Sequence, residues 1–322
     1  MNIAWHDIIL DSETPKNAWN DIFGSLQKLA QITTSPVALH EHTVIPDRVI
    51  SETAWQLWHE YPNVAVRTSN ELKNWCGQTT STGKAVLILD ALSIRELASL
   101  VAGAQRHGAD PSIIRITGSE CPSTTDSFAN ALGLQSRSAL AHNGKPATFN
   151  LFHSSYNDVY TDVISIPFED CSVPPASNVL IWHSWLDDLI HLQHKLPDQI
   201  YKTAESVLQS DGFWNFINKL RQGRKLVVTS DHGYAVSKMF SSEVSDTDAI
   251  DILKKTFGAS RNKTASQQWQ SQFMPPIVMT HNKQHVVMGQ WKWKVQGGFP
   301  HVCHGGMSLL EVAVPWIEFN CI

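Results

Sequence analysis

The stretch Lys225-Leu226-Val227-Val228-Thr229-Ser230-Asp231-His232-Gly233 decides the fold class. Its apolar first half is typical of a buried strand, and the glycine turn begins directly after a carboxylate and an imidazole. Open α/β sheets bind ligands at the carboxyl ends of their strands. Asp and His there are good ligands for a divalent metal, although the same pair also occurs in ordinary turns. Asp231 and His232 are therefore candidate site residues. Whether they form a metal site depends on the side chains at the ends of the other strands.

Strands and helices alternate before this stretch. The continuous apolar run Ala85–Leu89 is typical of a strand buried on both faces. We expect strands at 85–89, 112–117, 178–182 and 225–229, and helices at 93–106, 124–132 and 199–220. This alternation predicts an α/β fold with a mostly parallel central sheet and helices on both faces.

The remaining segments are less regular. Residues 1–80 form an N-terminal accessory region of mixed helix and loop in our prediction, followed by one domain over 81–322. Apolar residues recur with helical spacing at 18–30 and 51–61. Residues 134–177 look irregular, and residues 234–275 are polar, as in a mobile segment. Further strands are expected at 277–279, 285–294 and 312–319. Trp291 and Trp293 alternate with lysines, which favours a strand with one apolar face over a surface that stacks on nucleic-acid bases.

The composition limits the class of protein. With 322 residues, 42% hydrophobic and 17% charged, the chain is long enough for one large α/β domain or two smaller ones. A net charge of -5 gives no general attraction to nucleic acid or anionic membranes. The five cysteines are scattered without a CxxC pair, which argues against a disulfide framework or a thiolate zinc site. The sequence shows no signal-peptide pattern or transmembrane run, so we expect a cytoplasmic protein with no membrane partner.

Three other places carry side chains of the same kind. They are Asp90 after the first strand, the pair Asp187 and His191, and His304 before two glycines. Four residues apart on a helix, Asp187 and His191 share one face and can reach one metal. Asp188 and His194, which are six residues apart, could make a similar pair. The two glycines after His304 let the backbone approach a bound group closely. Taken singly, each place also has an ordinary structural explanation as a helix cap, a solvated face or a turn.

Taken in order, these pieces resemble the alkaline phosphatase superfamily and, within it, the PglZ family. The resemblance rests on Leu87–Leu92, Pro122–Thr125, His183–His191, Thr229–Gly233 and His304–Pro315. These motifs span about 85–315, and the first 80 residues match no family that we can name. The resemblance implies an alkaline-phosphatase-like fold for the domain.

The resemblance also implies two divalent metal ions. The first would be held by Asp90, Asp231, His232 and the nucleophilic hydroxyl, and the second by Asp187, His191 and His304. The family's P-x-x-T turn places the nucleophile at Thr125, with Ser123 and Thr124 as rivals because one sequence does not determine the register of the turn. Oxygen and nitrogen ligands suit Zn²⁺ best, with Mn²⁺ or Mg²⁺ as alternatives.

The chain departs from the family pattern at two positions that are not predicted ligands. Ser93 stands where many relatives have Arg, and Ile190 stands where many have Gly. The first change puts substrate handling in doubt. Arg95 and Arg261 are the candidates for the missing positive group.

The activity implied by the resemblance is metal-dependent phosphoester hydrolysis. Two ions about 4 Å apart can hold the attacking and leaving oxygens, and one of them activates the threonine. We expect a phosphodiesterase acting on nucleotides or nucleic acid, because PglZ-like proteins resemble nucleotide-processing members of the superfamily. PglZ proteins are associated with bacterial anti-phage defence, which implies protein partners there. The alternatives are a phosphomonoesterase or phosphomutase-like enzyme, and a catalytically silent scaffold that binds partner proteins.

Overall fold

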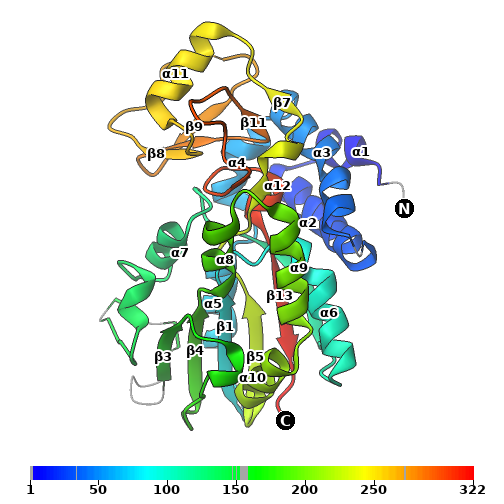
Figure 1. Ribbon diagram of the computed structural model, residues 1–322, viewed down its shortest axis with the longest axis vertical. Coiled ribbons are helices and arrows are strands. Elements are labelled where there is room, and N and C mark those ends of the chain that lie inside the picture. Colours follow the sequence, from blue (N-terminus) through cyan, green and yellow to red (C-terminus); the bar gives the residue numbers. More distant parts are fainter. Residues whose placement is uncertain (1–2, 34, 147, 150, 153–158, 272) are drawn as a thin grey trace.

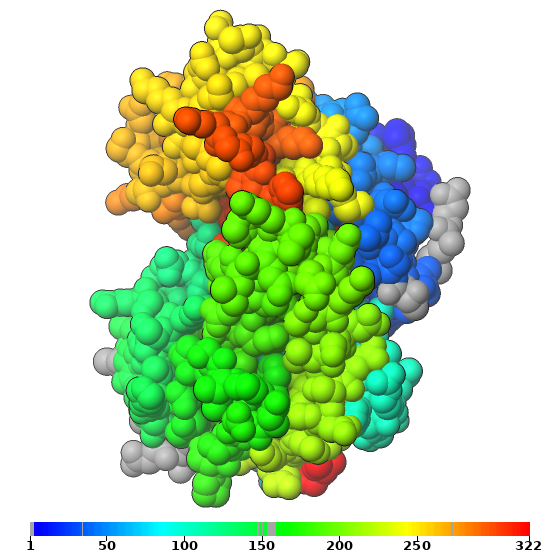
Figure 2. All heavy atoms as spheres, in the orientation of Figure 1, coloured from blue at the N-terminus to red at the C-terminus, as the bar shows by residue number. Residues whose placement is uncertain are grey.

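The computed structural model describes residues 3–33, 35–146, 148–149, 151–152, 159–271 and 273–322. Figure 1 shows a central sheet with helices on both faces, and a cap of short strands and one helix beyond the end at which the parallel strands finish. The space-filling view in Figure 2 shows the yellow and orange cap above the green and teal body, with a notch in the outline between them.

The central sheet has six strands in the order β2-β13-β5-β1-β4-β3. They are β1 (Gly83–Leu89), β2 (Ile113–Gly118), β3 (Val159–Ile164), β4 (Asn178–His183), β5 (Arg224–Thr229) and β13 (Ala313–Phe319). β1 pairs in parallel with β4 and β5, whereas β13 runs antiparallel to β2 and β5. β13 is reversed because the chain returns from the cap and enters the sheet at the carboxyl ends of the other strands. The predicted mostly parallel sheet is therefore confirmed.

Each face of the sheet has its own hydrophobic core. In β1, Ala85, Leu87 and Leu89 lie in one core and Val86 and Ile88 in the other, as the alternation of side chains along a strand requires. The first core is covered by α2 (Pro15–Ile32), α6 (Leu97–Arg106), α9 (Pro197–Leu208) and α10 (Asp211–Arg221). The second is covered by α5 (Thr68–Gly77) and α7 (Thr125–Ala131). A strand buried on both faces explains the uninterrupted apolar run.

The N-terminal helices join the cores of this sheet, with α2 packed against β2. Besides α2 and α5 they are α1 (Trp5–Leu10), α3 (Pro36–Glu52) and α4 (Gln56–Val64). Trp19 of α2 is buried and donates through Nε1 to the carbonyl of Leu57 at 2.9 Å. The hydroxyls of Thr68 and Thr117 lie 2.7 Å apart, which joins α5 to β2. The described residues before 80 therefore share the cores of the sheet, and a domain boundary at 80 stays a prediction.

Two predicted helices are wrong in extent. The single helix expected at 199–220 is divided into α9 and α10, because the Ser210 hydroxyl accepts from the Phe213 amide at 3.2 Å and starts a new helix. The helix expected at 51–61 is divided between α3 and α4 by residues 53–55. Hydrophobic spacing continues across both breaks, so the periodicity alone does not reveal them.

Some elements were not expected. The segment 134–177 contains β3 at the sheet edge and the short 3-10 helices η2 (Arg137–Leu140) and η4 (Phe168–Asp170), while residues 147, 150 and 153–158 lie outside the described part. Because β3 is half-buried and carries Tyr160 and Asp162, it lacks the apolar run that marks the inner strands.

The cap is built from the polar segment and the tail. It contains β7 (Ser242–Glu243), α11 (Thr247–Phe257), β8 (Asn262–Thr264), β9 (Val278–His281), β10 (Gln284–Val287) and β11 (Trp291–Lys292) around a small core of its own. One strand was expected over 285–294, but Gly289, with a φ of +63°, turns the chain between β10 and β11. β6 (Ala235–Val236) pairs in antiparallel with β12 (Val302–Cys303), and η5 (Ser237–Met239) follows β6. None of the helices in the described residues has the length and apolar character of a membrane span.

Candidate metal centre

The predicted acidic residues lie at the carboxyl ends of three neighbouring strands. β5, β1 and β4 are adjacent in the sheet. Asp90 follows β1, and Asp231 and His232 follow β5. Asp187 lies in the first turn of α8 (Trp185–Gln193), which follows β4. Parallel strands that end at one edge therefore bring these side chains to one place.

The hydroxyl of Thr125, at the start of α7, lies against Asp90 and His232. Thr125 Oγ1 donates to Asp90 Oδ1 at 3.3 Å and is 3.2 Å from His232 Nε2. The other oxygen of this carboxylate, Asp90 Oδ2, accepts from the indole Nε1 of Trp182 at 3.1 Å. Asp90 and His232 are completely buried. The hydroxyl is thus held by one carboxylate oxygen and one imidazole nitrogen.

Backbone contacts orient His232 and Asp231. His232 Nδ1 lies 3.0 Å from the Gly233 carbonyl, and donation there leaves Nε2 free to bind a metal. Asp231 Oδ1 accepts from the Ala91 amide at 3.0 Å, while Asp231 Oδ2 lies 3.5 Å from His232 Nε2. Ala91 has a φ of 62°, a strained conformation for a residue other than glycine. Its hydrogen bond to Asp231 helps to hold that conformation beside the site.

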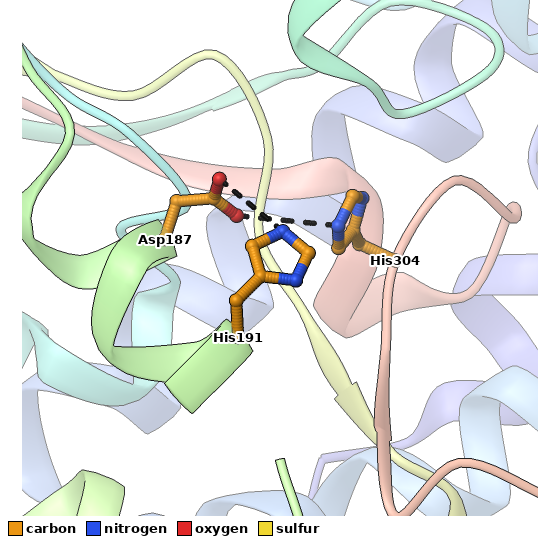
Figure 3. A group of neighbouring side chains, drawn as sticks. All are labelled: Asp187, His191 and His304. Carbon is orange, nitrogen blue, oxygen red and sulfur yellow. Dashed lines mark ion pairs between the residues drawn. The ribbon is translucent and has the colours of Figure 1, made fainter. Parts of the chain in front are cut away.

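A second group forms around Asp187. Asp187 Oδ2 lies 3.5 Å from His191 Nε2, and Asp187 Oδ1 lies 4.0 Å from His304 Nε2. In Figure 3 the carboxylate and the two imidazoles point toward one another, with two side chains from α8 and one from the segment before α12 (Leu309–Val312). The ring of His304 also stacks on that of His232, with centroids 4.5 Å apart. The prediction that Asp187 and His191 share one helix face is confirmed.

Asp187 links the two groups. Among the described residues, Asp187, His191 and His304 place ligand atoms within 4.8 Å of one another, and so do Asp90, Asp187 and His232. The structure thus brings every predicted ligand to the same edge of the sheet, with Asp187 between the two sets.

The electrostatics of the cluster favour added positive charge. Burial raises the pKa of Asp90 well above its usual range, and the nearby Asp231 and Asp187 raise it further. Burial also raises the pKa of Asp187. The pKa of His304 is lowered, first by burial and then by His232 and His191, so this imidazole is neutral and able to act as a ligand. Crowded buried carboxylates are stabilised either by taking up protons or by a cation bound between them, so a bound cation would be held strongly here.

Two buried carboxylate oxygens of the cluster have no hydrogen-bond partner. They are Asp187 Oδ1 and Asp231 Oδ2. Buried polar atoms are bonded in the great majority of cases, so two in one cluster point to a group that binds there. Carboxylate and imidazole donors without thiolates suit Zn²⁺, or Mn²⁺ as an alternative. The residues therefore fit divalent metal ions.

The three hydroxyls of the turn have different surroundings. Ser123 Oγ donates to the Gly306 carbonyl at 2.7 Å and accepts from the Gly305 amide at 3.0 Å. Thr124 Oγ1 accepts from the Ser127 amide at 3.2 Å and so caps α7. Of the three, Thr125 is the one whose hydroxyl contacts the predicted ligands.

The glycines after His304 serve the fold. Gly305 has a φ of +91°, and a Cβ there would collide with Asn262. A Cβ on Gly306 would collide with the guanidinium of Arg261. The close approach predicted for these glycines therefore occurs, but toward Asn262 and Arg261 of the same chain rather than toward a bound group.

Neither arginine suggested from the sequence contacts the cluster. Arg95 lies 2.8 Å from His40 Nδ1 and donates to the Tyr201 hydroxyl at 2.9 Å. Arg261 donates through Nε to Glu311 at 2.8 Å. Both guanidinium groups are buried in these pairs.

Within the described part of the chain, the cation that reaches the site is Arg137. Its Nη1 contacts Asp90 Oδ2 and lies 4.0 Å from Asp187 Oδ2. Arg137 belongs to η2 in the stretch that looked irregular, so no motif or spacing marked it. Trp182 was likewise expected only as a strand residue, although it donates to Asp90.

The departures from the family pattern leave the ligands in place. Ser93 forms a capping box with Glu96 at η1 (Ile94–Glu96), and Ile190 is buried in the first core. In the rival pair, Asp188 accepts from the Ser184 hydroxyl at 2.6 Å and His194 Nδ1 lies 3.1 Å from the carbonyl of His191. These two side chains are therefore occupied locally and do not form a second pair.

Comparisons with known proteins identify relatives. A family model described as "BREX system PglZ alkaline phosphatase-like domain" matches residues 154–319. Among solved structures, the chain is similar to an inactive form of murine ectonucleotide pyrophosphatase/phosphodiesterase 5 in complex with AMP, at 13% identity over 74% of this chain and 88% of that chain, with a TM-score of 0.42. It is also similar to phosphonoacetate hydrolase from Sinorhizobium meliloti 1021 in complex with phosphonoacetate, at 11% identity over 75% and 90% of the two chains, with a TM-score of 0.39. No curated protein sequence matches the chain.

Proposed function

Because this chain belongs to the PglZ family of alkaline phosphatase-like domains, we propose that it is a metal-dependent phosphohydrolase with Thr125 as its nucleophile. The position of the Thr125 hydroxyl carries the proposal. It lies 3.3 Å from Asp90 Oδ1 and 3.2 Å from His232 Nε2, beside buried acceptors that lack partners. A hydroxyl placed at a metal-ligand cluster is the arrangement that nucleophilic phosphoryl transfer requires.

The residues that would hold the ions form two sets, and Asp187 of the second set also lies within reach of Asp90 and His232 of the first. Asp90, Asp231 and His232 with Thr125 form the first set, and Asp187, His191 and His304 form the second. The donor types favour Zn²⁺, with Mn²⁺ or Mg²⁺ as alternatives. When bound, such ions lower the pKa of a hydroxyl ligand and neutralise the negative charge of a phosphoryl group.

The chain's own residues orient the nucleophile. Asp90 Oδ1 accepts the hydrogen bond of the Thr125 hydroxyl, and Trp182 holds the other carboxylate oxygen so that the group cannot rotate freely. The Thr125 oxygen attacks phosphorus, and the bond to the leaving alcohol breaks. Water then hydrolyses the phosphothreonine ester and restores the hydroxyl. Burial of Asp90 and His232 keeps bulk water from competing for these contacts.

The narrower proposal is a phosphodiesterase acting on nucleotides or nucleic acid in the cytoplasm. It is supported by family membership, because PglZ-like proteins resemble nucleotide-processing enzymes of the superfamily. The family's description as part of a BREX system supports a role in bacterial antiviral defence together with protein partners. The five cysteines are unpaired thiols, which agrees with a reducing compartment.

The test is an assay of protein stripped of metal and reloaded with Zn²⁺ or Mn²⁺. A chromogenic phosphodiester and the matching monoester are compared, with Thr125→Ala and Thr125→Ser in parallel. We expect metal-dependent turnover, higher for the diester, that is lost in Thr125→Ala and partly kept in Thr125→Ser, because serine retains an attacking oxygen.

Full turnover by Thr125→Ala would contradict the assignment of the nucleophile. A preference for the monoester would favour the phosphatase alternative. Metal binding without hydrolysis of either ester would favour the scaffold that binds partner proteins.

A further inference from the structure

A cavity of about 740 Å³ lies where the first turn of α3 meets the start of α9, the turn before it, and the segment β6–η5. We call it the η5 pocket. Its apolar wall includes Val37, Leu196 and Met239, and the side chains of Val37 and Leu196 are 38% and 60% exposed. A cavity with exposed apolar walls is typical of a surface that binds a partner.

The rim of the η5 pocket carries more positive than negative charge. Lys195, Lys238 and His301 line it together with one carboxylate, Asp198, and all four residues are exposed. Within the described part of the chain, neither ammonium group forms a salt bridge. Two free ammonium groups beside an apolar wall suit a partner that combines carboxylates with an apolar side chain.

The charge beneath the η5 pocket has the same sign. Tyr201, which also lines the pocket, accepts a hydrogen bond from the buried guanidinium of Arg95 at 2.9 Å. The neighbouring carboxyl of Glu96 binds the Tyr234 hydroxyl at 2.6 Å instead of Arg95. Burial raises the pKa of Glu96 to about 7, so this carboxyl offsets the charge of Arg95 only in part. The pocket therefore has a positive floor as well as a positive rim.

One edge of the cap has the complementary character. Glu243, Asp246 and Asp248 line a cleft together with Ile252, and no lysine, arginine or histidine of the described residues lines it. All four residues are exposed, Ile252 by 37%. Asp248 and Ile252 are four residues apart in α11, so they lie on one face of the helix. We call these four residues the cap edge.

The cap edge points away from the molecule to which it belongs. Leu253 and Phe257, on the other face of α11, are buried in the core of the cap and fix the helix there. Figure 1 shows α11 at the outer end of the cap, whereas α9 lies against the central sheet. An η5 pocket that receives the cap edge therefore belongs to another molecule.

We propose that the η5 pocket of one copy of this chain binds the cap edge of a second copy. Ile252 packs against the apolar wall of the pocket. Glu243 and Asp248 lie beside the ammonium groups of Lys195 and Lys238. An amphipathic helix laid against an apolar groove is a recurring mode of recognition. Because each copy carries both surfaces, the contact closes a two-fold dimer or repeats along a chain of molecules.

The experiment is sedimentation velocity of the purified full chain over a range of protein and salt concentrations. We expect wild type to associate, and to associate less at high salt because exposed charges are screened. The double variants Lys195→Glu, Lys238→Glu and Glu243→Lys, Asp248→Lys should each associate about 10-fold or more weakly, since like charges then face each other. Asp246 is kept, because its carboxylate accepts from the Ala249 amide and caps α11.

Mixing the two double variants is the decisive step. In the mixture, the reversed pocket of one variant meets the reversed cap edge of the other, so association should return although each variant alone stays monomeric. The control is Lys16→Glu, Lys28→Glu, two exposed lysines of α2 whose reversal changes the net charge equally. The control should associate like wild type.

Wild type that remains monomeric at every concentration overturns the proposal. Association that survives in both double variants overturns it too, because another surface would then hold the copies together. Two monomeric variants that do not associate when mixed contradict the pairing of these two surfaces. Thermal unfolding of each variant checks that it is folded. If a double variant does not fold, Ile252→Ser decides, since removal of this apolar side chain should weaken association about 10-fold and wild-type association would overturn the contact.

Self-association is measured without turnover, so this proposal and the hydrolase fail separately. A chain that associates through these surfaces but hydrolyses no ester contradicts the hydrolase and leaves the contact. A monomeric chain that hydrolyses esters contradicts the contact and leaves the hydrolase.

Discussion

Two clusters of buried charge in this protein differ in how completely they are satisfied. In the pair formed by Glu311 and Arg261, Glu311 Oε1 accepts from Arg261 Nε at 2.8 Å and from the Gly306 amide at 2.9 Å. Glu311 Oε2 accepts from the amide and the hydroxyl of Ser308 at 3.1 and 2.6 Å. At the candidate metal centre, by contrast, Asp231 Oδ2 has no hydrogen-bond partner.

The difference separates a structural cluster from a binding cluster. Glu311 and Arg261 neutralise each other, and their hydrogen bonds hold the glycine segment and α12 in place. The carboxylates of Asp90, Asp187 and Asp231 crowd one another, with one partly exposed arginine against two of them. Nearly complete bonding is the rule for buried polar groups, so unbonded oxygens on two neighbouring, crowded carboxylates, Asp187 and Asp231, point to a bound cation.

The largest effect is expected for Asp231→Asn. The asparagine side chain keeps the shape of the aspartate and an oxygen that can accept from the Ala91 amide, but it lacks the negative charge that binds a metal ion. Turnover should fall by more than about 100-fold, since even residues that only support metal ligands contribute 10- to 100-fold. The metal-free variant should be at least as stable as wild type, because one of the crowded charges is gone. Activity assays and thermal unfolding check both parts, and wild-type turnover with wild-type metal content would refute the assignment of Asp231.

For Glu311→Ala we expect the opposite result for stability, namely a large loss. Arg261 would remain fully buried without its counter-charge, so the free energy of unfolding should fall by about 3–5 kcal/mol in urea denaturation. The control is Asp251→Ala, which breaks an exposed pair with Lys254 on α11 and should cost less than about 1 kcal/mol. Similar losses of unfolding free energy in the two variants would contradict the description of Glu311 and Arg261 as a structural cluster.

A smaller effect concerns Asp47, which tethers α3 to the structural cluster. Asp47 Oδ2 accepts from the Leu309 amide and from Gln290 Nε2, each at 3.0 Å. Burial nevertheless raises the pKa of Asp47 to about 7. Because the folded protein holds this proton more tightly than the unfolded chain, the associated stability is complete below about pH 4 and is lost as the pH rises through 7.

Asp47→Asn does not titrate, so it should gain stability relative to wild type as the pH rises through this window. The gain should be at most about 1.4 kcal/mol per pH unit. Urea unfolding of both proteins at about pH 5 and about pH 8 measures the difference. A constant difference between the two proteins would show that Asp47 has an ordinary pKa in the folded state.

The parts that the sequence predicts well are those with a strong local signal. The inner strands are marked by unbroken apolar runs because both faces are buried, and the candidate ligands Asp90, Asp231 and His232 are marked by their positions after two of those strands. The breaks near Ser210 and Gly289 escape notice because apolar spacing continues through them. Arg137 could not be found, since its role depends on how η2 packs on β3 and α7 in three dimensions. Choosing Thr125 over Ser123 likewise needs the contacts of Ser123 with the glycine segment.

The most direct test of the account is the metal content of the chain after chelation and reloading with zinc. The unsatisfied carboxylates and imidazoles predict about two zinc ions per chain in the wild type, and about one in His191→Ala, because this substitution removes a ligand from one set only. Zinc should also raise the unfolding temperature of the wild type in a concentration-dependent way. A wild-type chain that retains no zinc and shows no such shift would contradict the claim that this cluster is a metal centre.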